Sequence, residues 1–122
     1  MSVKVLAIDD SRTIRELVRS ALDAADIEVT VAVDGVDGVE QFQTAEADCV
    51  ITDINMPNMD GFGVIDAIRN GAVNRSVPIL VLTTESGAEM KQRARNAGAT
   101  GWIVKPFDDT ALVATVRRVT GG

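Results

Sequence analysis

Five short apolar segments alternate along the chain with segments of helical periodicity, and this alternation restricts the fold more than any other feature. Most of the apolar segments are nearly continuous runs of Val, Ile, Leu and Ala, which is typical of strands covered on both faces. The five segments are 3–8, 28–33, 48–53, 77–83 and 101–105. Strands separated by helices predict an α/β fold built on a parallel sheet.

The segments between the strands carry apolar residues at helical spacing. These segments are 11–26, 34–45, 61–69, 86–97 and 108–119. The buried faces expected in the first two are Ile14, Leu17, Val18, Ala21 and Leu22, and Val36, Val39 and Phe42. Segment 86–97 is mostly polar and offers a thin apolar face made of Ala88, Met90, Ala94 and Ala97.

Right-handed connections between parallel strands leave few possible topologies. Of the two common doubly wound orders, five strands favour 2-1-3-4-5. The 122 residues suit one domain, so residues 1–122 are expected to fold as a single unit. The predicted fold is a doubly wound (βα)5 domain of the flavodoxin-like type, with helices on both faces of the sheet.

Charge and residue usage exclude several classes of function. The formal net charge of −6 argues against binding to nucleic acid or to an anionic membrane. No apolar segment approaches the roughly 18 residues that a membrane span needs. The absence of histidine excludes histidine-based triads and histidine metal sites. Cys49 is the only cysteine, which fits a reducing cytoplasmic location.

Polar side chains end four of the predicted strands. Asp9 and Asp10 follow the first strand, Asp53 ends the third, Thr83 ends the fourth, and Lys105 ends the fifth. Ligands of open parallel sheets bind outside the carboxyl ends of the strands, at the point where the strand order reverses. With the order 2-1-3-4-5, the first and third strands are neighbours, so three carboxylates are expected to converge there.

Three carboxylates in one place repel one another unless one is protonated or a cation is present. A site made of oxygen donors suits Mg²⁺ better than zinc or copper. Lys105 adds a positive charge suited to phosphoryl oxygens, and the Thr83 hydroxyl can hydrogen-bond to one of them. Together these groups predict a cation-assisted phosphoryl site with a carboxylate as the nucleophile.

Each of these residues also has a purely structural interpretation. Asp9, Asp10 or Ser11 is expected to cap the helix that follows, and a single Asp at a strand end commonly caps or turns the chain. A Thr at the end of a strand does not by itself indicate a functional site. Lys105 lies between apolar residues, where burial demands a partner. Their joint position at one sheet edge favours the phosphoryl site.

Four motifs, in order, resemble the receiver domain of two-component response regulators. They are "DD" at 9–10, "DINMPNMDG" at 53–61, "VLTTE" at 81–85 and "KPF" at 105–107. The resemblance covers essentially the whole chain and is greatest to the free-standing CheY-like chemotaxis type. That type itself has the strand order 2-1-3-4-5, so the order is not independent of the resemblance.

The resemblance implies a role for each acidic residue. Asp53 would accept a phosphoryl group from the phosphohistidine of a histidine kinase and form an acyl phosphate. Asp10 and Asp53 would ligate Mg²⁺ directly, together with the main-chain carbonyl of Asn55. Asp9 would act mainly through metal-bound water.

The resemblance also assigns the remaining positions. Lys105 and Thr83 would bind the phosphoryl oxygens, and the bond between Lys105 and Pro106 would be cis. Trp102 occupies the position of the family's switch aromatic residue. Core packing is the alternative interpretation, and the predicted site favours the switch role. Three further residues stand at positions that tune phosphoryl access and lifetime: Asn55, Thr84 and Glu85.

The resulting expectation is a monomeric signalling domain without an output domain, which accepts phosphoryl groups but is not a multiple-turnover enzyme. Its phosphodonor would be a CheA-like histidine kinase, and its target a flagellar motor switch protein or another protein. The alternative within the family is a phosphate sink or relay intermediate for a shared kinase, and a second alternative is a degenerate receiver that binds partners without phosphorylation.

Two other classes share parts of the pattern. A flavodoxin-like cofactor binder needs a phosphate-cradling loop after the first strand, but Asp9 and Asp10 there would repel a phosphate. Hydrolases of the haloacid dehalogenase type place a second Asp two residues after the nucleophile, where this chain has Asn55. Both alternatives are therefore less favoured than the receiver domain.

Overall fold

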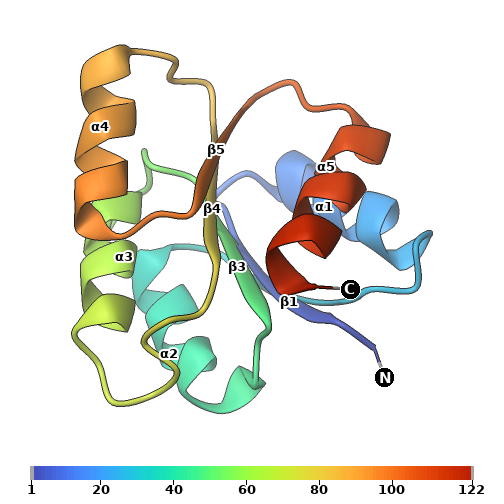
Figure 1. Ribbon diagram of the computed structural model, residues 1–122, viewed down its shortest axis with the longest axis horizontal. Helices are drawn as coiled ribbons and strands as arrows, with labels where there is room; N and C mark the ends of the chain where they lie inside the picture. The colour runs from blue at the N-terminus through green and yellow to red at the C-terminus, as the bar shows by residue number, and fades with distance from the viewer. Residues whose placement is uncertain (1, 122) are drawn as a thin grey trace.

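Strands and helices alternate strictly through residues 2–121, the part of the chain that the computed structural model describes (Figure 1). The strands are β1 (Lys4–Ile8), β2 (Glu28–Ala32), β3 (Cys49–Thr52), β4 (Ile79–Thr83) and β5 (Gly101–Val104). The helices are α1 (Arg12–Asp23), α2 (Gly35–Ala45), α3 (Gly61–Arg69), α4 (Ala88–Ala97) and α5 (Asp109–Thr120). All neighbouring strands are parallel and lie in the order β2-β1-β3-β4-β5, which confirms the predicted fold.

The sheet separates two apolar cores because its central strands bury both faces. Helices α1 and α5 cover one face, and α2, α3 and α4 cover the other (Figure 1). Along β1, Leu6 packs into the core under α2 and α3, whereas Val5 and Ala7 pack into the core under α1 and α5. This two-sided burial is the physical reason why the strand sequences are continuous apolar runs.

Side chains cap four of the five helices at their first turn. The capping residues are Ser11 for α1, Asp34 for α2, Asp60 for α3 and Asp108 for α5. Because Ser11 caps α1, neither Asp9 nor Asp10 is needed for that purpose. Helix α4 begins after Gly87, which makes no side-chain capping bond.

Three predicted core positions are wrong. Leu17 is 49% exposed and Val36 is 47% exposed, and Ala88 is also exposed. In α2 the buried side of the helix runs through Gly35, Gly38 and Phe42, so Val36 lies to the side of it. A Cβ on Gly38 would lie 2.4 Å from Cδ1 of Ile8, so the helix packs there through its backbone. Hydrophobic periodicity cannot register such a contact.

Strand and helix ends differ from prediction by at most three residues. The largest shift is at α1, which ends at Asp23 instead of residue 26. Next are β4, which begins at Ile79 instead of residue 77, and α4, which begins at Ala88 instead of residue 86. Pro78 precedes β4 and has no N–H to donate to a strand ladder. Among the described residues, no helix is long and apolar enough to cross a membrane.

Cys49 is fully buried in β3, and this burial governs its chemistry. Removal of the thiol from water, with a smaller effect of the Asp48 charge, raises the pKa of Cys49 to about 12. The thiol is therefore protonated at neutral pH and acts as a small apolar side chain in the core.

Candidate functional site

The site lies at the carboxyl edge of the sheet, where β1 and β3 run side by side. Main-chain hydrogen bonds continue past the ends of both strands: Asp9 N donates to Ala32 O at 3.1 Å, and Asp53 N donates to Ile8 O at 3.1 Å. The sheet therefore fixes the backbone of both acids. Asp10 follows Asp9 directly and lies at the exposed side of the site.

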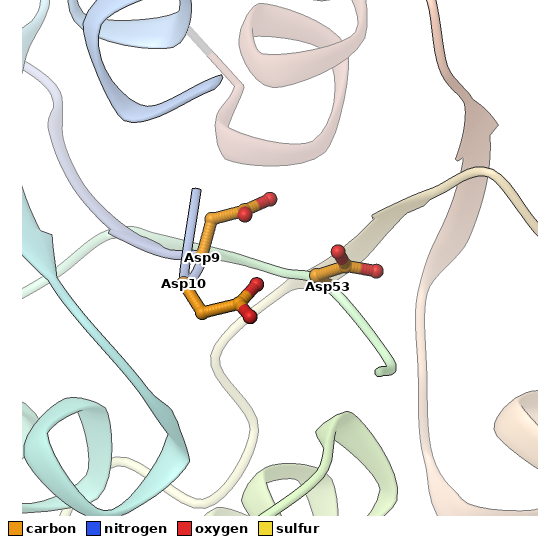
Figure 2. A group of neighbouring side chains, drawn as sticks. All are labelled: Asp9, Asp10 and Asp53. Atoms are coloured by element: carbon orange, nitrogen blue, oxygen red, sulfur yellow. The ribbon is translucent and has the colours of Figure 1, made fainter. Parts of the chain in front are cut away.

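The three predicted carboxylates converge as expected. One carboxylate oxygen from each of Asp9, Asp10 and Asp53 lies within 4.8 Å of the others. Figure 2 shows the three side chains grouped about one space, two from the end of β1 and one from the end of β3. The side chains of Asp9 and Asp53 are only 6% and 11% exposed, so their mutual repulsion is poorly screened by water.

Lys105 partly neutralises this cluster. Its Nζ atom lies 2.7 Å from Oδ2 of Asp9 and 2.9 Å from Oδ2 of Asp53. The Lys105 side chain is itself only 9% exposed, so its ammonium group replaces lost water contacts with two charged hydrogen bonds. The anionic partner expected for a buried Lys105 is therefore present as two carboxylates, those of Asp9 and Asp53.

The pKa values reflect this crowding. Burial alone lowers the pKa of Lys105, but the hydrogen bonds and charges of Asp9 and Asp53 outweigh burial and leave that pKa raised. Burial raises the pKa of Asp9, and the bonds from Lys105 and the Ser11 N–H offset this only in part. The cluster holds three carboxyl groups but only one ammonium, which contacts two of them, and this leaves excess negative charge for a second cation.

In each buried carboxylate, one oxygen accepts a hydrogen bond from a backbone N–H and the other accepts from the Lys105 ammonium. Asp9 Oδ1 accepts from the N–H of Ser11 at 2.9 Å, and Asp53 Oδ1 accepts from the N–H of Ile54 at 2.6 Å. Their Oδ2 atoms both accept from Lys105. The backbone bonds fix the orientation of the carboxylates, while further lone pairs on the oxygens can bind a metal ion.

The donor set fits Mg²⁺. The acidic group is made of oxygen ligands only, and Mg²⁺ is typically held by one or two carboxylates and several waters. Asn55, whose carbonyl was predicted as a ligand, lies in the loop directly after Asp53 and is exposed. The three carboxylates of Asp9, Asp10 and Asp53 are the group that could hold the ion.

Glu85 connects three of the residues that the sequence singled out. Its N–H donates to Oγ1 of Thr83 at 3.3 Å, and its carbonyl accepts from Nε1 of Trp102 at 3.0 Å. Its carboxylate accepts from Nδ2 of Asn55 at 3.1 Å. The sequence placed Glu85 only among the tuning positions, since no pattern of spacing indicates contacts made by its main chain.

Thr83 ends β4, and Lys105 directly follows the neighbouring strand β5. Thr83 is fully buried, and its carbonyl accepts from the Lys105 N–H at 2.8 Å. The Lys105–Pro106 bond is cis, as the family resemblance implied. Thr84, by contrast, is exposed.

Arg15 of α1 also contacts the site, although no sequence motif singled it out. Its Nη1 donates to the carbonyl of Asp9 at 2.7 Å and so holds the segment that carries two of the acids. A single Arg on a helix has many possible partners, and its sequence position does not distinguish them.

Comparison with known proteins points to one family. Residues 5–117 match the response regulator receiver domain. Protein PilG of Pseudomonas aeruginosa is 30% identical over 115 residues, which cover 94% of this chain and 85% of PilG. The transcriptional regulatory protein PrrA of Mycobacterium leprae is 34% identical over 116 residues, but the match covers only 49% of PrrA. The chain thus spans about half the length of that relative.

Solved structures agree with the sequence matches. The chemotaxis protein CheY4 of Vibrio cholerae is 44% identical and superposes with a TM-score of 0.93, over 98% of this chain and 99% of CheY4. The receiver domain of the Francisella response regulator 1452 is 26% identical, with a TM-score of 0.91 over 98% of both chains.

Proposed function

The chain belongs to the response regulator receiver domain family, and we propose that it accepts a phosphoryl group on Asp53 from the phosphohistidine of a histidine kinase. Receiver domains are phosphoacceptors rather than conventional enzymes. One observation carries the choice of Asp53: its buried carboxylate, directly after β3, faces both acids that follow β1 and also contacts the ammonium of Lys105 at 2.9 Å.

The proposed step is transfer of the phosphoryl group to the Asp53 carboxylate. A carboxylate oxygen of Asp53 attacks phosphorus, the P–N bond to the donor imidazole breaks, and the electron pair stays on that imidazole. Mg²⁺, held by Asp10, Asp53 and the carbonyl of Asn55 and reached by Asp9 through water, would neutralise charge on the phosphoryl oxygens. Lys105 supplies a second positive charge, 2.9 Å from Oδ2 of Asp53.

Thr83 and Trp102 offer a route from the phosphoryl group to the surface. The Thr83 hydroxyl accepts from the Glu85 N–H and retains its own proton, which it can donate to a phosphoryl oxygen. Movement of Thr83 would act on Glu85, whose carbonyl holds the indole of Trp102. Helix α4 fully buries only Ala94, with Met90 of its first turn packed partly against the core. Its first turn also lacks the side-chain capping bond that holds the start of the other helices, which favours a shift there.

The biological setting belongs to the same proposal. Similarity to a chemotaxis protein supports a role in chemotaxis. In that role the proposed donor is a CheA-like kinase, and the proposed target is a flagellar motor switch protein or another protein. Residues 1–122 would act as a single receiver domain. The alternative is a phosphate sink for a shared kinase. Phosphorylation-dependent binding to a motor switch protein would favour the role in motor control. Rapid phosphate turnover without such binding would favour the phosphate sink.

Phosphorylation should require a divalent cation. Incubation with acetyl phosphate and Mg²⁺ is expected to add one phosphoryl group, seen as a mass increase of the intact protein. Chelation with EDTA should abolish the increase, because the repulsion between the three carboxylates and the incoming phosphate is then uncompensated. Equal phosphorylation in EDTA would contradict the proposed site.

Trp102 should report on the site by its fluorescence. Because its indole donates to the carbonyl of Glu85, Mg²⁺ or the phosphoryl analogue beryllofluoride is expected to change its emission intensity. The chain contains no other tryptophan, so the signal belongs to Trp102. An Asp53→Asn variant serves as the control and should lose the response to beryllofluoride. If the emission stays constant with Mg²⁺ and with beryllofluoride, the proposed link between Trp102 and the acidic site is contradicted.

A further inference from the structure

A hydrogen bond between side chains joins the two loops that precede α2 and α3. Nδ2 of Asn58 donates to Oδ2 of Asp34 at 2.8 Å. The other oxygen, Oδ1 of Asp34, accepts from the N–H of Asp37 at 2.8 Å and so caps α2. One carboxylate therefore ties residues 54–60, the loop after Asp53, to the first turn of a helix.

Backbone packing reinforces the same contact. A Cβ placed on Gly35 would lie 2.3 Å from the carbonyl oxygen of Met59, so the start of α2 lies directly against the loop. Asn58 has a φ of 70°, in the left-handed region that asparagine adopts more readily than most residues. The loop is thus held by Gly35 and Asp34 together.

The Asp34 carboxylate is a strong acceptor. Its pKa is lowered, first by the Asp37 N–H and then by the Asn58 amide. It is therefore ionised at neutral pH, and hydrogen bonds to an ionised acceptor are stronger than those between neutral groups.

The ends of the loop are held independently of this contact. Ile54 is buried, and its carbonyl accepts from the N–H of Gly61 at 2.9 Å. A Cβ on Gly61 would lie 2.3 Å from the carbonyl oxygen of Asp53, so α3 begins pressed against the site. Asn55 lies between Ile54, at the fixed start of the loop, and the contact at Asn58.

We infer that Asp34, Gly35 and Asn58 form a clamp that positions the main chain of Asn55 for the cation of the acidic site. The inference rests on the proposed function, in which the Asn55 carbonyl is a metal ligand. None of the three clamp residues belongs to the acidic group that would hold the cation, so they are positioning residues. A loop already fixed in its bound conformation loses less entropy when the metal binds.

The expected effect follows from comparison with other metal sites. Partners that bond directly to a metal ligand typically change metal affinity by about 10–100-fold when removed. The clamp acts through two intervening residues and is exposed to water. Its loss is therefore expected to raise the Kd for Mg²⁺ by about three- to tenfold, below that range.

Two variants of the clamp test the inference, with Mg²⁺ alone as the probe and calorimetric titration as the measurement. Asn58→Gly removes the hydrogen bond but keeps the net charge and tolerates the positive φ. The exchange Asp34→Asn with Asn58→Asp restores the bond in the reverse direction, because an asparagine at the first position can cap α2 and donate to a carboxylate at the second. The first variant should weaken Mg²⁺ binding, and the second should return the Kd close to that of the unmodified protein.

Thermal unfolding without Mg²⁺ separates positioning from stability. A merely structural role lowers the unfolding temperature of Asn58→Gly but leaves its Kd for Mg²⁺ unchanged, and this result would overturn the inference. An exchange variant as weak as Asn58→Gly would also overturn it. If the unmodified protein binds no Mg²⁺, or if Asp53→Asn binds it equally well, the proposed site itself fails and the clamp fails with it.

Discussion

Replacement of Asp53 by Asn is expected to reduce phosphorylation by acetyl phosphate or by a kinase below detection. Asparagine has nearly the same shape, and its Oδ1 can still accept from the Ile54 N–H, so the fold should persist. The amide, however, is a far weaker nucleophile than the carboxylate and carries no charge for the cation. The measurement is incorporation of phosphate into the intact protein over time.

The matched control for this variant is Asp66→Asn. Asp66 is an exposed acid on α3, outside the acidic cluster, so the substitution removes one negative charge without altering the site. This control should be phosphorylated at the rate of the unmodified protein. Phosphorylation of the Asp53 variant at that same rate would show that the acceptor lies elsewhere.

Replacement of Lys105 by Ala is expected to have the second largest effect. The rate of phosphoryl transfer should fall by about 10²–10³-fold, the typical cost of removing one preorganised group that stabilises developing charge. The variant should also lose about 3–5 kcal/mol of stability in Mg²⁺-free buffer, because a buried ion pair has lost one partner. Asp9 and Asp53 would then face each other without the ammonium that both contact.

Added Mg²⁺ should recover part of the stability that the Lys105 variant loses. A ligand that binds only the folded state stabilises it in proportion to the logarithm of its concentration over its Kd. Removal of the ammonium leaves more negative charge at the site, so Mg²⁺ should stabilise this variant more than the unmodified protein. Lys4→Ala is the control, because the ion pair of Lys4 with Glu46 at 3.6 Å is solvent-exposed. An equal response to Mg²⁺ in both variants would exclude Lys105 as a competitor for the carboxylates.

The sequence was sufficient to predict the sheet and the residues at its edge. Continuous apolar strands indicated a sheet buried on both faces, and that topology brings the residues after β1 and β3 together. Asp9, Asp10 and Asp53 could therefore be grouped without coordinates, because their grouping depends only on strand order. Lys105 could be added because a lysine between apolar residues requires an anionic partner.

Contacts made through backbone or through exposed side chains could not be predicted in the same way. Val36 was expected in the core because hydrophobic spacing counts side chains, whereas α2 packs against Ile8 through Gly38. The connection through Glu85 depends on its main-chain N–H and carbonyl, which every residue has. The bond between Asp34 and Asn58 joins residues 24 positions apart, and its existence depends on the paths of two loops.

The central claim, that Asp53 is the phosphoacceptor, is tested most directly by locating the phosphoryl group. The protein is incubated with acetyl phosphate and Mg²⁺, cleaved under conditions that preserve acyl phosphates, and analysed by tandem mass spectrometry. The account predicts a single modified residue, Asp53, with Asp9 and Asp10 unmodified. A phosphoryl group on any other residue, with Asp53 unmodified, would contradict it.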